Sequence, residues 1–448
     1  MSAQRLERAL LLARIVGQFE ERVNAFLDYG GAHPKAQFGD LEAEARRLSR
    51  DCFALVLQEA IEVRREPVES EWRCDCGGSA EYKGDQARNI ETYVGRIEVN
   101  RGYYYCSTCS KGHYPLDEAV GIARGQFSDE IQNGVCRLGA ALPFEPAAET
   151  FVALTGIGIS AREVERLTED RGAHLEEHLA KEREKLLGVD TNSVERASLE
   201  EAGIWAVALD AARARFDDGW HDVKAGVVFW AKPKVIDAAV DGAHAERQSY
   251  VGEVGAMEKA GQRLYAEAVK RGVDPAEDRV VCLGDGAPVN WSQFALHFPN
   301  RVEVLDWWHG VDHLWAAGNG LFGEGSAAAK GWVDERKAEL WEGEVERVVN
   351  ALQAAANEPK GEAAADEIHY FDTNKEKMRY KRFREAGYPI GSGTVESACK
   401  RLIGARLKQA GMCWTKKGAQ PVLSLRAGLL SQRWGENWRL THADRKAA

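Results

Sequence analysis

Apolar residues recur at three- and four-residue steps from Leu6 to Val63, which is the spacing of an amphipathic helix. Gly30 and Gly31 interrupt this pattern, and it resumes from Leu48 to Val63. We therefore expect a helical region over residues 1–70 made of two helices, with packing or self-association as its role. The apolar positions of the first helix are Leu6, Leu10, Leu11, Ile15, Phe19, Val23 and Phe26.

Residues 71–120 have a different pattern, in which two cysteine pairs flank a segment of strand-forming residues. Residues 88–105 alternate as in a β-hairpin with its turn near Gly95. Two thiolate pairs on turns, held apart by a hairpin, are the arrangement of a zinc ribbon with a structural Zn²⁺. The alternative is four unligated thiols, and the short C-x-C spacing of the first pair leaves it open. The pairs are Cys74 with Cys76 and Cys106 with Cys109.

Residues 121–200 include a pattern typical of a helix-turn-helix. Thr155 and Gly156 predict the turn, and Ser160 followed by Glu163 predicts a capping box at the start of the second helix. Any pair of helices joined by a short turn gives the same pattern, so DNA binding is one of two interpretations. The charged stretch 176–187 is expected to be a helical linker.

The side chains of this predicted motif divide into buried and exposed sets. We expect one set of side chains to point inward: Ala147, Phe151, Leu154, Val164 and Leu167. The two residues expected to point outward, as candidate DNA contacts, are Arg162 and Arg166.

Across residues 201–313 strands and helices alternate, in the chain order of an RNase H-like sheet: three strands, a helix, a strand, a helix and a strand. Residues 314–385 then predict only helices, which suggests an all-helical insertion. Residues 386–448 would complete the domain with a further helix. The predicted strands are Trp205–Asp210, Val223–Trp230, Gln248–Val254, Arg279–Leu283 and Arg301–Asp306, and the predicted helices are Glu258–Arg271, Ser292–Phe298 and Thr394–Gln409.

Composition, with 44% hydrophobic and 29% charged residues, is typical of a soluble globular protein, and the length of 448 residues predicts two to four domains. The first residues lack the pattern of a signal peptide, and no run of apolar residues is long enough to span a bilayer. We therefore expect a cytoplasmic protein without a membrane partner. Its cysteines should be thiols or metal ligands, and the five outside the two pairs should be core residues.

Charge is unevenly distributed along the chain. The formal net charge is −11, yet residues 374–448 contain 17 Lys and Arg against 5 Asp and Glu. That segment carries +12 and the remainder −23. A basic segment on an acidic chain is typical of nucleic-acid binding, although a solvated charged face gives the same count.

Three acidic residues lie where two-metal chemistry requires carboxylates. Asp210 ends the first predicted strand, Asp285 follows the fourth between two glycines, and Glu396 lies in the first turn of the late helix. Cutting DNA needs two divalent cations about 4 Å apart, and Mg²⁺ binds carboxylates from separate elements. The long interval between Asp285 and Glu396 leaves room for the helical insertion.

The chain resembles the insertion-sequence transposases of the ISKra group, which are relatives of the Mutator-like DDE enzymes. The resemblance covers about residues 72–438. Its motifs are Leu283-Gly-Asp-Gly-Ala287, Leu305-Asp-Trp-Trp-His309 with Asp312-His-Leu-Trp315, Gly387-Tyr-Pro-Ile-Gly-Ser-Gly-Thr-Val-Glu396 and Arg406-Leu-Lys-Gln-Ala-Gly-Met-Cys-Trp414.

The resemblance implies a transposase that binds transposon ends and target DNA as a homodimer or higher oligomer associated with the nucleoid. It implies that Asp210, Asp285 and Glu396 form the DDE triad and hold two Mg²⁺ or Mn²⁺ ions. Asp306-x-x-His309 would be the D-x-x-H signature near the scissile phosphate. Family members usually have glycine after the first acid, whereas this chain has Ala211, so Asp217 and Asp218 stand as alternative first ligands.

The last set of candidate residues is basic and lies on or just beyond the helix of Glu396. These residues are expected to contact the phosphate backbone of DNA, with Lys400 beside Glu396 at i, i+4. His309 and His313 share the same spacing without the glutamate of a zinc-protease motif, so an orienting role is favoured over metal binding. The basic residues are Lys400, Arg401, Arg406 and Lys408.

Two other functions fit the same residues. A domesticated protein would keep the zinc ribbon and helix-turn-helix for sequence-specific DNA binding and would have lost transposition. A related two-metal nuclease or resolvase would cut DNA without strand transfer.

Overall fold

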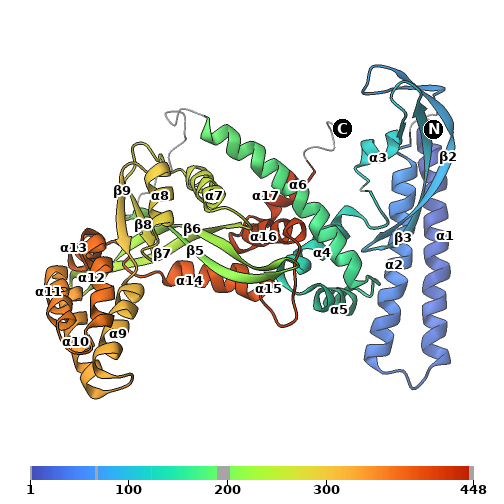
Figure 1. Cartoon of the computed structure of the whole chain (residues 1–448). Coiled ribbons are helices and arrows are strands. Elements are labelled where there is room, and N and C mark those ends of the chain that lie inside the picture. The colour runs from blue at the N-terminus through green and yellow to red at the C-terminus, as the bar shows by residue number, and fades with distance from the viewer. Residues whose placement is uncertain (1–2, 66–68, 123, 189–201, 443–448) are drawn as a thin grey trace. The chain divides into compact units, whose positions relative to one another are not determined.

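The computed structural model describes residues 3–65, 69–122, 124–188 and 202–442. The chain folds into two compact units (Figure 1). Unit 1 comprises Met1–Leu138, Phe144–Leu167 and His442–Ala448. Unit 2 comprises Gly139–Pro143 and Thr168–Thr441.

Unit 1 begins with a helical hairpin of α1 (Ala3–Ala32) and α2 (Phe38–Glu62). The expected break near Gly30 and Gly31 is confirmed, because α1 ends at Ala32, one residue after them. The second helix starts well before Leu48, at a capping box in which the Gln37 backbone N–H donates to Asp40 Oδ2.

A four-stranded antiparallel sheet follows the helical hairpin, and it confirms the β-hairpin expected around Gly95, where Thr92 pairs with Gly95. α2 packs on β3, and the shared core contains Ala54, Ile90, Ile97, Val99 and Leu116. The elements are β1 (Glu71–Arg73), β2 (Ser79–Thr92), β3 (Gly95–Cys106), β4 (Lys111–His113) and α3 (Pro115–Val120).

The predicted helix-turn-helix residues lie on α5 (Phe144–Thr155) and α6 (Ala161–Leu187), preceded by α4 (Asp129–Ala141). Gly156 makes the turn with φ +69°, and Ser160 Oγ accepts the N–H of Glu163 as expected of a cap. One expectation was wrong, because Leu154 is 70% exposed. Residues 176–187 are helical, as expected, and continue α6.

Unit 2 contains a mixed five-stranded sheet in the order β7-β6-β5-β8-β9. The first three strands along the chain pair antiparallel, whereas β8 lies parallel to β5 and β9 lies parallel to β8. All five strands were predicted, and the first three are longer than predicted. They are β5 (Ile204–Phe216), β6 (Gly219–Ile236), β7 (Ala239–Glu253), β8 (Val280–Gly284) and β9 (Arg301–Leu305).

Helices cover both faces of this sheet. α7 (Met257–Lys270) and α8 (Pro288–His297) lie over one face, and α14 (Gly393–Ala398) lies against β5 and β6 on the other (Figure 1). α16 (Lys416–Leu430) packs on β7. The core beneath α7 and α8 consists of large apolar side chains, among them Trp205, Val207, Leu209, Trp230, Leu264, Phe294 and Phe298.

The stretch between β9 and α14 is helical, as expected. The segment after Glu396 differs from the single α-helix predicted, because it includes the π-helical turn η3 (Cys399–Gly404) before α15 (Ala405–Leu407). α17 (Trp434–Leu440) is the last helix described. The helices after β9 are α9 (Trp307–Phe322), α10 (Ala327–Trp341), α11 (Val345–Ala356), α12 (Glu362–Asn374), the 3₁₀ turn η2 (Lys375–Met378) and α13 (Tyr380–Glu385).

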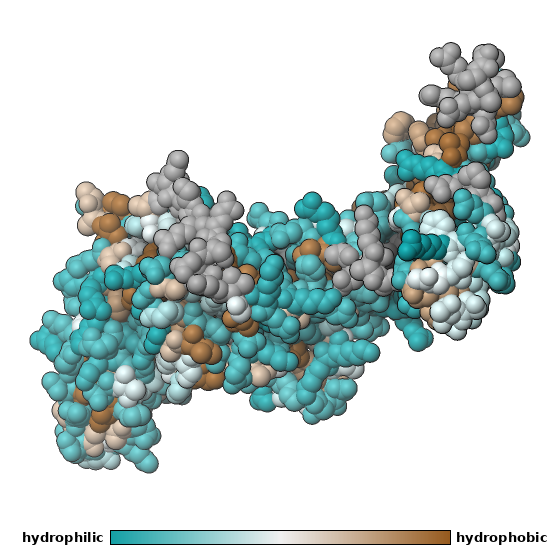
Figure 2. Space-filling model, turned by 90° about the horizontal axis from the view of Figure 1, so that it is seen from above, coloured by the Kyte–Doolittle hydropathy of each residue, from teal (hydrophilic) through white to brown (hydrophobic). Residues whose placement is uncertain are grey.

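The described surface of unit 2 is mainly hydrophilic on the face seen in Figure 2, where its brown apolar areas are small and separate. None of the helices in the described part of the chain is both long enough and apolar enough to cross a bilayer.

Gly172 tests the close packing of α6 on α16. A Cβ at this position would lie 2.5 Å from the backbone oxygen of Pro421, which cannot move independently. We predict that Gly172→Ala lowers the free energy of unfolding of unit 2 by about 1–3 kcal/mol, measured by urea denaturation. The control is Gly331→Ala within α10, where nothing lies within 4 Å of the new Cβ. This control should raise the free energy of unfolding by about 0.5–1 kcal/mol, because alanine favours a helix more than glycine does. Equal effects of the two changes would contradict the packing argument.

Candidate functional site

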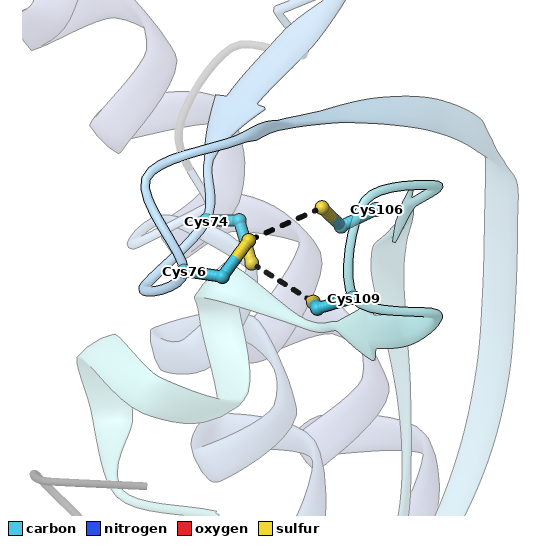
Figure 3. Close-up of side chains that lie close together, drawn as sticks. All are labelled: Cys74, Cys76, Cys106 and Cys109. Atoms are coloured by element: carbon cyan, nitrogen blue, oxygen red, sulfur yellow. Dashed lines mark hydrogen bonds between the residues drawn. The ribbon is translucent and has the colours of Figure 1, made fainter.

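Two groups of side chains can carry chemistry, and the first is the cysteine cluster of unit 1. The four Sγ atoms of Cys74, Cys76, Cys106 and Cys109 all lie within 4.8 Å of one another (Figure 3). Among the described residues, this is the one group of three or more His, Cys, Asp or Glu side chains that meets this limit. The sequence prediction that these two pairs converge is confirmed.

The register of the sheet brings the two cysteine turns together. Ala80, just after the first turn, pairs with Cys106, which begins the second. The short C-x-C turn closes because Gly77 adopts φ +84° and donates its N–H to the Cys74 oxygen. Left-handed backbone of this kind favours glycine. The tight spacing of the first pair is therefore compatible with a four-cysteine group.

The pKa values of the thiols in the cluster are shifted in opposite directions. Burial raises the pKa of Cys109, and for Cys74 a backbone hydrogen bond from Cys76 lowers the pKa whereas burial and the neighbouring thiols raise it, to about 12 overall. The backbone N–H groups of Cys109 and Thr108 hydrogen-bond to the Cys106 sulfur and lower the pKa of that thiol to about 6. His113 is buried, and its Nε2 lies 3.2 Å from Cys74 Sγ. Four sulfur donors in one group are the ligand set of a structural zinc site. The residues present therefore fit a metal ion such as zinc.

The other five cysteines are divided. Four are buried as predicted, and Cys413 is exposed, contrary to the expectation. The buried ones are Cys52, Cys136, Cys282 and Cys399.

The second group is a row of acids across the sheet of unit 2. Ala208 pairs with Leu283 and Gly284 pairs with Leu305, so the same register carried forward aligns Asp210, Asp285 and Asp306. The Asp306 N–H donates to the Gly284 oxygen at 2.9 Å, which continues the pairing beyond β9. Parallel strands thus bring residues far apart in the chain into one line.

The sequence suggested that Asp210 ends its strand. This expectation was wrong, because the hairpin of β5 with β6 continues to Phe216. Its Oδ2 accepts a hydrogen bond from the Cys399 thiol at 3.4 Å. Burial raises the pKa of Asp210, and the charge of Asp285 adds to this, whereas the Ala211 N–H, the Cys399 thiol and His309 lower it. Asp210 therefore lies within electrostatic range of both Asp285 and His309.

Cys399 connects Asp210 to the helix of Glu396. Burial raises the pKa of Cys399 well above its usual value, and the carboxylates of Asp210 and Glu396 contribute further. Cys399 is thus a neutral donor between two acids that lie far apart in the sequence. Nothing in the linear sequence distinguished it from the other core cysteines.

Asp285 sits in a loop held by its own side chain. Its Oδ1 accepts the N–H of Ala287 at 2.9 Å and the side-chain amide of Asn290 at 3.0 Å. The Tyr370 hydroxyl of α12 donates to the Asp285 backbone oxygen at 3.2 Å. Gly286 has φ +100°, and a Cβ there would lie 2.8 Å from the Tyr370 ring. The helical segment therefore packs directly on the Asp285 loop.

Sequence reasoning missed Tyr370 and Glu367 on the helical segment, both of which contact His313. The Tyr370 ring stacks on His313 with centroids 3.5 Å apart, and His313 Nδ1 lies 2.6 Å from Glu367 Oε2. Burial raises the pKa of Tyr370, as do the charges of Asp285 and Asp306, so its hydroxyl stays protonated as a donor. A tyrosine on a helix so distant along the chain from Asp285 carries no local signal of this role.

Asp306 is fully buried, and its carboxylate binds two backbone N–H groups. Oδ2 accepts the N–H of His309 as the N-cap of α9, and Oδ1 accepts the N–H of Ser392. It therefore anchors the loop before Glu396 instead of presenting a free carboxylate. His309 is half-buried beside it, and its side chain acts electrostatically on Asp210.

Glu396 lies in the first turn of α14, as predicted. Ser392 is the N-cap, and its hydroxyl donates to Glu396 Oε1 at 3.3 Å. Lys400 Nζ lies 3.4 Å from Glu396 Oε2, so the predicted i, i+4 contact is confirmed. The carboxylate is half-buried with access to solvent.

The predicted basic residues divide into exposed and buried side chains. Lys400, Arg401 and Lys408 are exposed, and Arg401 donates to the Tyr250 hydroxyl at 3.3 Å. Arg406 is completely buried, and its Nε donates to the Gly139 oxygen at 2.8 Å. The expectation that Arg406 contacts DNA was wrong, because its side chain lies in the protein core. The π-helical turn changes the direction of later side chains.

On α6, Arg162 and Arg166 point outward and Val164 and Leu167 are buried, as predicted. Arg166 pairs with Glu163 on the same helix at 2.7 Å. The alternative acids Asp217 and Asp218 lie in the exposed turn between β5 and β6, where Asp218 pairs with Lys416 and His221. This turn lies well beyond Asp210 along β5, so the structure gives them no place in the acid row.

Removing one cysteine should test the metal centre. We predict about one zinc per chain in the purified protein, and loss of that zinc in Cys106→Ser, measured by elemental analysis. Chelation should also unfold the four-stranded sheet, because in so small a module the free energy of metal binding stabilises the folded state directly. The control is Cys413→Ser, an exposed cysteine outside the cluster, which should keep its zinc. An unchanged zinc content in Cys106→Ser would contradict the assignment.

Compared with known protein families and with curated proteins, the chain matches none.

Proposed function

We propose that this protein is a DDE transposase, which binds transposon ends and catalyses metal-dependent cleavage and strand transfer of DNA. The observation that carries the proposal is the convergence of Asp210, Asp285 and the loop of Glu396. Asp210 and Asp285 are aligned along adjacent parallel strands, and Asp306 fixes the Glu396 loop beside them. These are the three acids that the resemblance to the ISKra group implies.

The topology of unit 2 supports an RNase H-like fold within this proposal. The first strand of the sheet is central, with the second and third antiparallel on one side and the fourth and fifth parallel on the other. The order matches the chain order expected of that fold from the sequence. The helical stretch between β9 and α14 would then be the insertion before the last acid.

Asp210, Asp285 and Glu396 would hold two Mg²⁺ or Mn²⁺ ions. Carboxylate oxygens are the ligands these hard cations prefer, and two such ions activate the attacking oxygen and stabilise the leaving oxygen. The three acids do not form one tight group, since the described residues contain no such set of carboxylate oxygens within 4.8 Å. A pair of ions about 4 Å apart would need a longer row of ligands than one such group.

The residues around the acids have positioning roles in this proposal. Tyr370 and Asn290 hold the Asp285 loop, and Asp306 holds the Glu396 loop. Both loops are therefore fixed before substrate binds, which lowers the reorganisation needed during reaction. His309 would orient the phosphate or a water molecule near Asp210.

DNA binding would involve both units. Arg162 and Arg166 on α6 and the exposed Lys400, Arg401 and Lys408 are the proposed phosphate contacts, and the cysteine module would be a structural zinc ribbon. Phosphate contacts of this kind position DNA without reading its sequence. We propose double-stranded DNA as the partner and a homodimer or higher oligomer on the nucleoid as the active form.

Glu396→Gln tests the metal-binding acid. The substitution keeps the shape of the side chain and removes its charge, so we predict that cleavage is abolished while binding to transposon ends is nearly unchanged. The measurement is cleavage and strand transfer on labelled end fragments with Mg²⁺, together with a binding assay. The control is Glu436→Gln in the first turn of α17, which should retain activity.

Each outcome of this assay separates the candidate functions. Full strand transfer by Glu396→Gln would remove Glu396 from the site. Specific binding without cleavage by the unaltered protein would favour the domesticated DNA-binding protein. Cleavage without strand transfer would favour a two-metal nuclease or resolvase.

Arg401 and Lys408 test the basic surface. Replacing both with Ala should weaken binding to all DNA sequences alike and reduce the salt dependence of log K by up to about two units of slope, because two phosphate contacts are lost. The control pair is Lys330→Ala with Lys360→Ala, two exposed lysines on the helical stretch after β9. An unchanged slope in the first double variant would assign Arg401 and Lys408 a solubilising role.

A further inference from the structure

The buried imidazole of His113 lies against the cysteine cluster of unit 1 without belonging to it. Its Nε2 is 3.2 Å from the Sγ of Cys74, and its side chain is only 8% exposed. Among the described residues, the group whose ligand atoms all lie within 4.8 Å of one another consists of the four cysteines and does not include His113. His113 is therefore a neighbour of the cluster that contacts one of its sulfurs.

The register of the four-stranded sheet holds His113 on the face of the cluster. β4 pairs antiparallel with β3, and His113 lies opposite Tyr104. Directly opposed residues of an antiparallel pair point to the same face. Tyr104 belongs to the apolar group that contains Cys74. Strand pairing therefore sets the position of the imidazole beside the Cys74 sulfur.

The direction of the contact follows from the chemistry of a metal-bound cysteine. Such a cysteine is a thiolate, which accepts hydrogen bonds and has no proton to donate. A nitrogen lone pair facing this sulfur at 3.2 Å would be repelled, so the Nε2 of His113 must carry the hydrogen. With metal bound, the contact is thus an N–H···S hydrogen bond from His113 to Cys74.

The two most buried sulfurs of the cluster need donors from the protein itself. Cys74 is 3% exposed and Cys106 is 0% exposed, so water contributes little to their hydrogen bonding. Cys106 accepts the backbone N–H groups of Cys109 and Thr108. Cys74 accepts the backbone N–H of Cys76. The side chain of His113 therefore adds to Cys74 what a second backbone N–H adds to Cys106.

The charge around the cluster also favours a donor at this position. Four thiolates exceed the charge of one divalent ion, so the metal-bound group is negative as a whole. Asp75 lies between the two cysteines of the first turn, and Glu118 Oε1 is 4.0 Å from His113 Nδ1. The N–H of His113 thus points into a region of negative charge, where it stabilises the ligated state.

We propose that His113 is a positioning residue of the metal centre, whose Nε2–H hydrogen-bonds to the Cys74 thiolate and holds this buried sulfur as a ligand. The inference rests on the structural zinc proposed for the cysteine module, and it adds a residue that is not itself a ligand. Hydrogen-bond partners of metal ligands contribute about 10- to 100-fold to metal affinity.

Zinc affinity tests this hydrogen bond in the full chain. Zn²⁺ is competed against a chelator of known affinity for the unaltered protein, for His113→Phe, which keeps a ring without an N–H, and for His113→Gln, whose amide restores a donor. We expect His113→Phe to weaken Zn²⁺ binding about 10- to 100-fold and His113→Gln to recover most of this loss. The control is His33→Phe, an exposed histidine just after α1, which should leave the affinity unchanged.

Two results of the competition would overturn the proposal. One is an unchanged affinity in His113→Phe. The other is an equal loss in His113→Phe and His113→Gln, because packing of the ring would then account for the effect. An unaltered protein that binds no Zn²⁺ would refute the metal centre itself, together with the role of His113, and is distinguished from the first two results by its zinc content.

Co²⁺ substitution gives a readout that packing alone would not change. The thiolate-to-Co²⁺ charge-transfer bands report how many sulfurs bind the ion and how much electron density they carry. We expect the intensity of four thiolates in both the unaltered protein and His113→Phe, with the bands of His113→Phe at lower energy, because loss of the N–H raises the energy of the sulfur electrons. The intensity of three thiolates in the unaltered protein would make His113 a ligand, and identical band energies would exclude the hydrogen bond. Either result would contradict the proposal.

Discussion

The buried carboxylate of Asp306 is the interaction on which the arrangement of unit 2 depends. It caps α9 through the His309 N–H and binds the Ser392 N–H of a loop much further along the chain. A buried carboxylate is costly without partners, and hydrogen bonds to a charged group contribute about 1.5–3 kcal/mol each. Because both oxygens are satisfied by backbone N–H groups, the loop before Glu396 has one favoured position, beside the end of β9.

This contact also explains how a long helical stretch can interrupt the site without displacing it. The stretch begins at α9, which Asp306 caps, and ends before the loop that Asp306 binds. Tyr370 adds a third fixed point, because its hydroxyl reaches the Asp285 backbone and its ring fills the space left by Gly286. The helices therefore support the acid row from outside the sheet.

The cysteine cluster of unit 1 also joins segments that are separate along the chain, here in a smaller module. The apolar group next to it is small, with Ala80 and Tyr104 beside Cys74 and Cys106. Metal binding by four convergent sulfurs would contribute the folding free energy that so few apolar side chains cannot contribute by their burial.

Much of the fold was predictable because local patterns reflect burial on a single element. Short apolar runs predicted the strands of unit 2, and the glycines at positions 95 and 156 predicted two turns. The cysteine pairs were predictable too, since each pair lies within one turn and a hairpin of known type must bring the turns together. Helix boundaries were less certain, since α2 begins at Phe38, well before the apolar pattern resumes at Leu48.

The sequence by itself determined the element types, the cysteine group and the identity of Asp210, Asp285 and Glu396 as candidates. Only the tertiary structure decided which of their neighbours matter. Arg406 is basic in a basic segment, yet it is buried against the Gly139 backbone, whereas Cys399 and Tyr370 contact the acids without any local signal. Residue type and spacing report the preferences of one segment, while these contacts join segments that are distant along the chain, and their formation depends on the packing of the whole unit.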